Sequence, residues 1–249
     1  MVNAYLRFVP TKVLNFLSAS LVDVKISGGK IHTVYPYTLH NLPKLDELIL
    51  DDNEIERLMP KAFINLPVLT KLGLGGNRIS VIHENVFVDL PNLQELFLDR
   101  NRVEVIEDFA LKPLRSLHEL DLRSNEIQEI NGNTFAGLSN LKRLDLFSNK
   151  IAILPDNVFE ELSKLEELDL MSNELHTISP HAFNGLKSLR SLQLSKNKLK
   201  MMSGPIFSEM PNLRDVQLSL NELKRMDKEV VLSLKPFTQD VAVKLKVFK

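Results

Sequence analysis

One asparagine recurs every 24 residues through most of the chain. A leucine stands three residues before each asparagine, a leucine or valine five before, and an isoleucine, valine or leucine two after. A fixed period of this length indicates a solenoid in which each repeat forms one coil of a stack. The asparagine occupies eight positions without a change of spacing: Asn53, Asn77, Asn101, Asn125, Asn149, Asn173, Asn197 and Asn221.

The residues around each asparagine predict a short strand. Residues 117–127 read LHELDLRSNEI, and residues 141–151 read LKRLDLFSNKI. Leucines alternate with polar residues, so they lie on one face of an extended segment. No single repeat can bury that face alone, and neighbouring strands therefore stack about 4.8 Å apart as a parallel sheet. A buried asparagine at the end of each strand must be hydrogen-bonded, and the backbone of the turns supplies partners.

A second column, ten residues after the asparagine, is aromatic. We interpret it as core, and the wider side of each coil then makes the stack curve with its sheet inside. In the repeat that begins at Asn101 this column holds Leu111, and Phe109 comes two residues early. The phenylalanines of the column are Phe63, Phe87, Phe135, Phe159, Phe183 and Phe207.

The pattern L-x-x-L-x-L-x-x-N-x-I followed by F-x-x-L resembles the leucine-rich repeat family in its typical 24-residue form. The resemblance covers residues 21–234 and includes a first copy, LVDVKISGGKI, at 21–31. It implies an α/β horseshoe solenoid with a parallel β-sheet on the concave face and short turns or 3-10 segments on the convex side. The family mainly binds proteins, and this form is commonest in extracellular proteins and receptor ectodomains with cysteine-bonded caps. This chain contains no cysteine.

Three segments follow from the repeat. Residues 1–20 are predicted to be an N-terminal capping or linker segment, residues 21–234 a solenoid of nine repeats, and residues 235–249 a C-terminal capping strand or linker. Apolar residues alternate in the last segment, which predicts a strand that shields the end of the sheet, because an open edge invites association. They are Val241, Val243, Leu245 and Val247.

Composition and motifs argue against several classes of function. The net charge of −1 is unlike that of a general nucleic-acid binder. No apolar run of about 18 residues encodes a membrane span. The chain lacks a phosphate-binding loop and the nucleophile motifs of hydrolases, and its six histidines fall at different phases of the repeat. A cation bridging the carboxylates of Asp121, Asp145 and Asp169 is conceivable chemistry, but we predict no metal, no cofactor and no enzyme activity.

The outward positions of each strand define the surface that can touch a partner. Counted back from each asparagine, positions −6, −4, −2 and −1 face the concave side. They hold eleven acidic and five basic residues, a net charge of −6 on a chain whose total is −1. Such a face favours a protein partner with a basic surface. An ordinary solvated sheet face that happens to be acidic is the alternative interpretation.

Three apolar side chains interrupt this polar face. Phe97, Phe147 and Met171 occupy positions that need no apolar residue for folding, and Phe147 and Met171 are predicted neighbours beside carboxylates. A small apolar spot with a polar rim is typical of a binding hot spot. The candidate partner-binding residues are Phe97, Glu119, Asp121, Arg123, Arg143, Asp145, Phe147, Glu167, Asp169 and Met171.

These observations favour a non-catalytic protein-binding module, the ligand-recognition region of an extracellular or cell-surface receptor-type protein. An intracellular adaptor or regulatory scaffold in the cytoplasm is the alternative, since the chain has neither cysteine nor an N-glycosylation sequon. A third hypothesis is an enzyme that carries the solenoid for recognition and its catalytic domain elsewhere. Fold alone does not separate these hypotheses.

Overall fold

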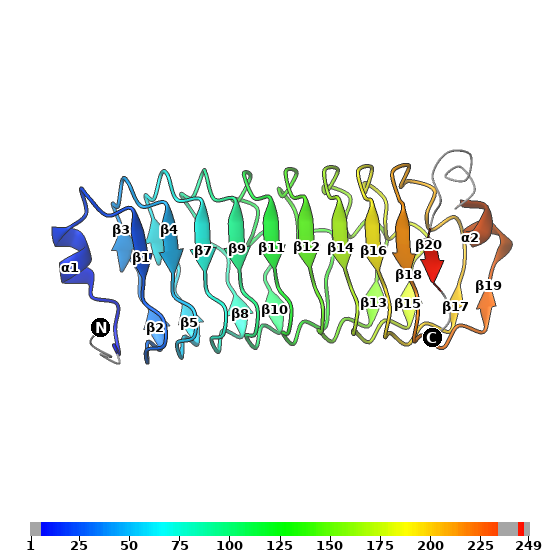
Figure 1. Ribbon diagram of the computed structural model, residues 1–249, viewed down its shortest axis with the longest axis horizontal. Coiled ribbons are helices and arrows are strands. Elements are labelled where there is room, and N and C mark those ends of the chain that lie inside the picture. Colours follow the sequence, from blue (N-terminus) through cyan, green and yellow to red (C-terminus); the bar gives the residue numbers. More distant parts are fainter. Residues whose placement is uncertain (1–5, 234–243, 247–249) are drawn as a thin grey trace.

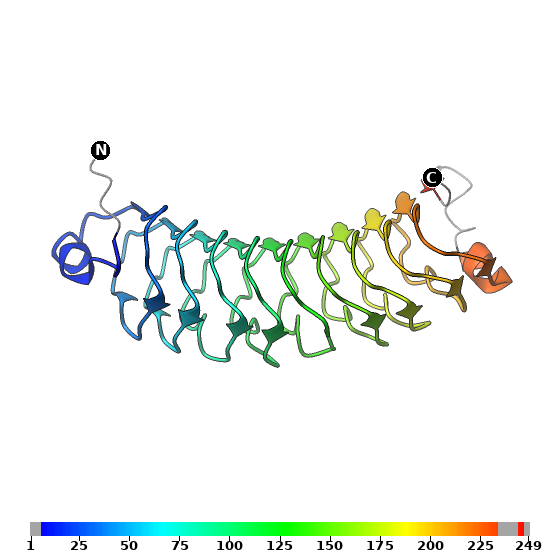
Figure 2. The same ribbon diagram turned by 90° about the horizontal axis from the view of Figure 1, so that it is seen from below.

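Ten parallel strands form one sheet along the inner face of a curved stack of coils, as Figures 1 and 2 show. The computed structural model describes residues 6–233 and 244–246. The first nine strands pair in register at a distance of 24 residues, for example Leu48 with Leu72, and this confirms the predicted concave sheet. The strands are β1 (Asp23–Lys25), β4 (Glu47–Ile49), β7 (Lys71–Gly73), β9 (Glu95–Phe97), β11 (Glu119–Asp121), β12 (Arg143–Asp145), β14 (Glu167–Asp169), β16 (Ser191–Gln193), β18 (Asp215–Gln217) and β20 (Lys244–Lys246).

The outer side of the coils combines turns with very short strands. Several turns are closed by a single i to i+3 bond, such as the Leu114 N–H to the Leu111 carbonyl at 3.0 Å. Two-residue strands of neighbouring coils also pair, which the sequence analysis did not predict. These pairs are β2 (Thr33–Val34) with β5 (Arg57–Leu58), β3 (Leu39–His40) with β6 (Phe63–Ile64), β8 (Val81–Ile82) with β10 (Val105–Ile106), β13 (Ile153–Leu154) with β15 (Thr177–Ile178), and β17 (Met201–Met202) with β19 (Arg225–Met226).

The repeated asparagine links each coil to the one before it. The side-chain amide of Asn125 donates to the carbonyls of Leu98 and Leu122, both at 2.9 Å. Its oxygen accepts the N–H of Val103, also at 2.9 Å. The same three bonds recur from Asn53 to Asn221, which confirms the predicted backbone partners. The first seven asparagines are buried and Asn221 is half-buried.

The leucine and phenylalanine columns form one continuous core. Phenylalanine rings of neighbouring coils stack, with centroids 5.9 Å apart for Phe135 and Phe159 and 6.2 Å apart for Phe159 and Phe183. Leu111 is buried in the same column, while Phe109 is 41% exposed. The column is therefore core, as predicted, and a smaller side chain interrupts the ring stack in the fourth coil.

The two ends of the stack are covered differently. At the N-terminal end, the short helix α1 (Thr11–Phe16) lies beside the first coil and buries Leu14 (Figure 1). At the other end, helix α2 (Lys228–Ser233) follows the last coil and β20 pairs with β18, Val216 opposite Leu245. The strand expected near 241–247 is thus present over 244–246. The rest of the predicted segment 235–249 lies outside the described residues, and the boundaries at 20 and 234 stay a prediction.

Candidate functional site

Four adjacent strands position the candidate residues on the concave face. Phe97 on β9 is opposite Asp121 on β11, which is opposite Asp145 on β12, which in turn is opposite Asp169 on β14. The intervening leucines point into the core and are fully buried. All ten predicted residues lie on these four strands or directly after them, so they come from one continuous part of the sheet. They share its concave side because alternate side chains of a strand face opposite sides.

Asp121 is the most buried of the predicted residues, with 5% of its surface exposed. One carboxylate oxygen accepts the N–H of Arg123 at 3.0 Å, and the other lies 3.2 Å from the Arg123 Nε. The pKa of Asp121 is raised to about 6, mainly by burial and to a smaller extent by the charges of Asp145 and Asp99, while the backbone bond and the charge of Arg123 lower it. Asp121 therefore offers little accessible surface, because residues in register on both sides and Arg123 crowd it.

Asp145 and Asp169 repeat this arrangement without a basic partner. One oxygen of Asp145 accepts the N–H of Phe147 at 2.9 Å, and one oxygen of Asp169 accepts the N–H of Met171 at 2.8 Å. Within residues 6–233 the second oxygen of each carboxylate has no hydrogen-bond or ion-pair partner. Burial, followed by the charge of Asp145, raises the pKa of Asp169 above its ordinary value.

The apolar residues of the face are half-buried. Phe147 and Met171 follow neighbouring strands, and the Ser148 N–H donates to the Met171 carbonyl at 3.0 Å, so their backbones lie side by side. Phe97 lies apart from them on β9, with the Nζ of Lys71 5.3 Å from its ring centroid. Each ring or thioether thus retains accessible surface on the side away from the leucine core.

A hollow of about 270 Å³ opens on the concave face over β12, β14 and β16. The charged residues around it are three acids and one base. The Nε of Arg143 is 3.8 Å from carboxylate oxygens of both Glu119 and Glu167, which is a loose pair of contacts. The lining residues are Arg143, Leu144, Asp145, Glu167, Leu168, Asp169, Ser191 and Gln193.

A second acidic group lies over the glycines of residues 72–77. A β-carbon at Gly75 would lie 2.5 Å from an oxygen of Asp99, so a larger residue there would require the Asp99 side chain to move. Arg100 contacts Asp99 at 2.8 Å and Asp52 at 3.5 Å. The first residues of this run belong to β7.

The backbone conformation directly before each of the eight asparagines, at position −1, was not predicted from the sequence. All eight residues there have a positive φ, including Leu220 at 58°. Glycine, serine and aspartate in several repeats are the signal that could have revealed this turn. The column consists of Asp52, Gly76, Arg100, Ser124, Ser148, Ser172, Lys196 and Leu220.

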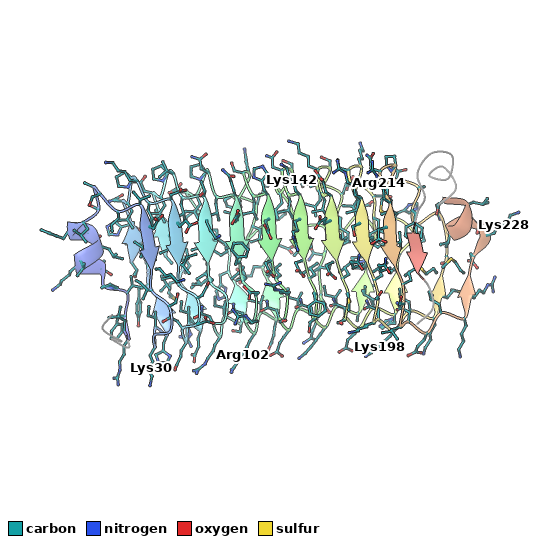
Figure 3. The ribbon with its side chains drawn as sticks, viewed as in Figure 1. Lys30, Arg102, Lys142, Lys198, Arg214 and Lys228 are labelled. Carbon is teal, nitrogen blue, oxygen red and sulfur yellow. The ribbon has the colours of Figure 1, made fainter. Side chains whose placement is uncertain are left out.

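Basic residues gather away from this acidic face. Figure 3 shows Lys142 and Arg214 projecting along one long edge of the sheet and Arg102 and Lys198 along the other. Some of these edge residues pair with acids one coil away, such as Lys198 with Glu174 at 2.7 Å. Among the described residues, no group of three histidines or acids is arranged to hold a metal ion.

Comparison with known sequences places these observations in a family. The profile described as Leucine rich repeat matches residues 19–79, 43–103, 91–151 and 140–199. The chain belongs to the leucine-rich repeat family. No curated protein sequence matches this leucine-rich repeat chain. In the part of the chain that the structure describes, no helix is long and apolar enough to cross a membrane.

Solved structures share the leucine-rich repeat fold of this chain. A TLR13–ssRNA13 complex superposes with a TM-score of 0.78 at 29% identity, covering 82% of this chain and 29% of that one. The Drosophila Toll–Spatzle complex superposes with a TM-score of 0.83 at 24% identity, covering 92% of this chain and 30% of that one. This chain therefore spans about 30% of the length of either solved chain.

Proposed function

We propose that the concave face of this leucine-rich repeat chain binds a protein and performs no catalysis. The observation that carries the proposal is the pair Phe147 and Met171, which lie half-buried on the outward side of the sheet. The core is already formed by leucines that point the other way, so these two residues are not needed to build it. Apolar side chains with a polar rim gain free energy when a partner covers them.

The chemistry of the face supports a protein partner with a basic surface. Carboxylates outnumber basic groups on the concave columns, and this charge repels the phosphates of a nucleic acid. One solved relative is a complex with single-stranded RNA and another is a complex with the protein Spatzle. For this chain the acidic face favours the second kind of ligand.

We further propose an extracellular or cell-surface setting, as in a receptor-type protein. The similarity to Toll and TLR13 supports it. The cytoplasmic adaptor is the second candidate, and the absence of cysteine and of a sequon favours it. Protease treatment of intact cells that express the full gene product separates the two, because only a surface protein is digested.

A site-specific photo-crosslinker tests the binding face. We expect a crosslinker at position 147 to attach a partner, and the affinity of the purified pair to fall at least tenfold in F147A/M171A. The matched control is V105A/I153A, which removes two exposed apolar side chains from the outer strands β10 and β13. Equal affinity of F147A/M171A and the unaltered protein, with the fold retained, refutes the proposal.

A further inference from the structure

We infer that the hollow over β12, β14 and β16 receives an arginine side chain of the protein partner. This inference rests on the proposed function and names the group that the face recognises. It begins with the carboxylates of Asp145 and Asp169, each of which has one oxygen bonded to a backbone N–H and one without a partner in the described chain.

The fifth repeat shows how this kind of carboxylate is satisfied. Asp121 occupies the same position on β11 and bonds the N–H two residues later in the same way. Its second oxygen is paired with the guanidinium of Arg123. In the next two repeats the residue equivalent to Arg123 is Phe147 or Met171, so the chain supplies an apolar surface where it had supplied a cation. A guanidinium from outside would restore the missing pair.

The shape and the charge of the hollow fit a guanidinium. Asp145 and Asp169 are in register on neighbouring strands, about 4.8 Å apart. A guanidinium has five N–H donors in a planar fork and can donate to two carboxylates at once, whereas an ammonium acts as a point charge. The methylene stem would lie on Phe147 and Met171, as long basic side chains do on apolar surface.

The charge around the hollow also leaves room for a second cation. Asp145, Glu167 and Asp169 face a single base, Arg143. Arg143 is 3.8 Å from both Glu167 and Glu119 and forms no ion pair with either aspartate in the described chain. Its charge lowers the pKa of Asp169 by less than the charge of Asp145 raises it. Ser191 and Gln193 on β16 add neutral polar groups at the far rim. The gain from pairing is larger here than on an open surface because both aspartates are partly desolvated.

The test uses the full chain with 13C-labelled methionine methyl groups and four short peptides. The peptides are acetyl-Gly-Arg-Gly-amide and its lysine, citrulline and alanine versions. We expect the arginine peptide to shift the Met171 methyl signal, assigned with M171L, with a dissociation constant on the order of 1 mM. The citrulline peptide, which keeps the shape of the arginine side chain without its charge, should bind at least tenfold more weakly. The lysine peptide should bind more weakly by a factor of about three or more.

Two matched variants locate the site. In D145N/D169N the amide oxygens still accept the backbone N–H groups, so the fold is kept, and we expect at least tenfold weaker binding of the arginine peptide. D156N is the control, since Asp156 accepts the His181 N–H on the outer side of the stack and should leave binding unchanged.

The outcomes separate this inference from the proposed function. Equal binding of the arginine and citrulline peptides, or equal binding by D145N/D169N and the unaltered chain, overturns the arginine site. Equal binding of arginine and lysine overturns the choice of a guanidinium. If the arginine site fails while F147A/M171A still loses its crosslinked partner, the concave face remains the binding surface. If both fail, the proposed function fails as well.

Discussion

Replacement of Asn125 by alanine should be among the most damaging single substitutions in the stack. The change removes three bonds. The N–H of Val103 loses its partner, whereas the carbonyls of Leu98 and Leu122 each keep a bond from the side-chain amide of Asn101 or Asn149. A buried polar group without a partner costs about 1–3 kcal/mol, and a carbonyl with a second bond costs less. We therefore expect the free energy of unfolding to fall by about 2–4 kcal/mol, mostly from the Val103 N–H, out of the 5–15 kcal/mol typical of a folded protein.

Asn221 provides the internal control for this prediction. It makes the same three bonds, to Leu194, Leu218 and Leu199, but lies half-buried near the end of the stack. Water can replace the lost bonds there, so Asn221→Ala should cost about 1–2 kcal/mol. Both variants remove the same side-chain atoms. They differ in the access of water to the groups left behind, and in N221A the Leu218 carbonyl also loses its one bond among the described residues.

Urea unfolding followed by far-ultraviolet circular dichroism measures the two losses, since the chain has no tryptophan. Amide hydrogen exchange then shows where protection is lost, because a solenoid can open locally. In N125A we expect faster exchange in the coils that contain Val103 and Asn125. Equal losses of free energy in N125A and N221A would refute the reasoning, because the cost would then not depend on exclusion of water.

Three further predictions follow from single residues. The pKa of Asp121 is raised to about 6, so the folded state binds this proton more tightly than the unfolded state, and the free energy of unfolding falls as pH rises from about 4 to 6. In urea unfolding, D121N should therefore be more stable than the unaltered chain by about 1–3 kcal/mol at pH 7.5 and differ little from it at pH 4. In the same assay, Gly185→Ala should lower the free energy of unfolding by more than about 2 kcal/mol and Gly28→Ala by about 1 kcal/mol. Both glycines have a positive φ, but only at Gly185 would the new methyl group collide with a backbone carbonyl, that of Glu160. Equal losses would contradict this explanation. Phe159→Ala should cost about 3–5 kcal/mol, since the ring is fully buried between Phe135 and Phe183, and a calorimetric loss below 1 kcal/mol would show that the column is not core.

The repeat made most of the fold predictable. The 24-residue spacing fixed the register of nine strands, because the same side chain must return to the same place in every coil. The asparagine bonds followed from its burial, and the interruption of the phenylalanine column at Leu111 followed from its identity. The short outer strand pairs were not predicted, since backbone bonds between coils at these places do not require a particular side chain. Helix α2 was not predicted either.

The site was predictable as a surface but not in its local contacts. Alternation along the strand placed Phe147 and Met171 on the outward side, where they are half-buried. The burial of Asp121 depends on how Arg123 folds over it, and the hollow depends on the orientation of several side chains at once. Pairwise geometry of this kind is not encoded in periodicity, so the unpaired oxygens of Asp145 and Asp169 became visible only in three dimensions.

The constant 24-residue register also governs how the chain can grow or shrink. Backbone pairing joins each strand of the sheet only to the strand before and the strand after. Among the described residues the ion pairs reach at most two coils, as between Arg100 and Asp52, so none joins the two ends of the horseshoe. Removal of one whole period, for instance residues 126–149, would bring Asn125 directly before the former Lys150. Each later strand would then pair in the same register as before, with the sheet shorter by one strand. Removal of a single residue within a strand would instead turn its leucines toward water. Length is thus a quantity that evolution or an engineer can adjust in units of one coil.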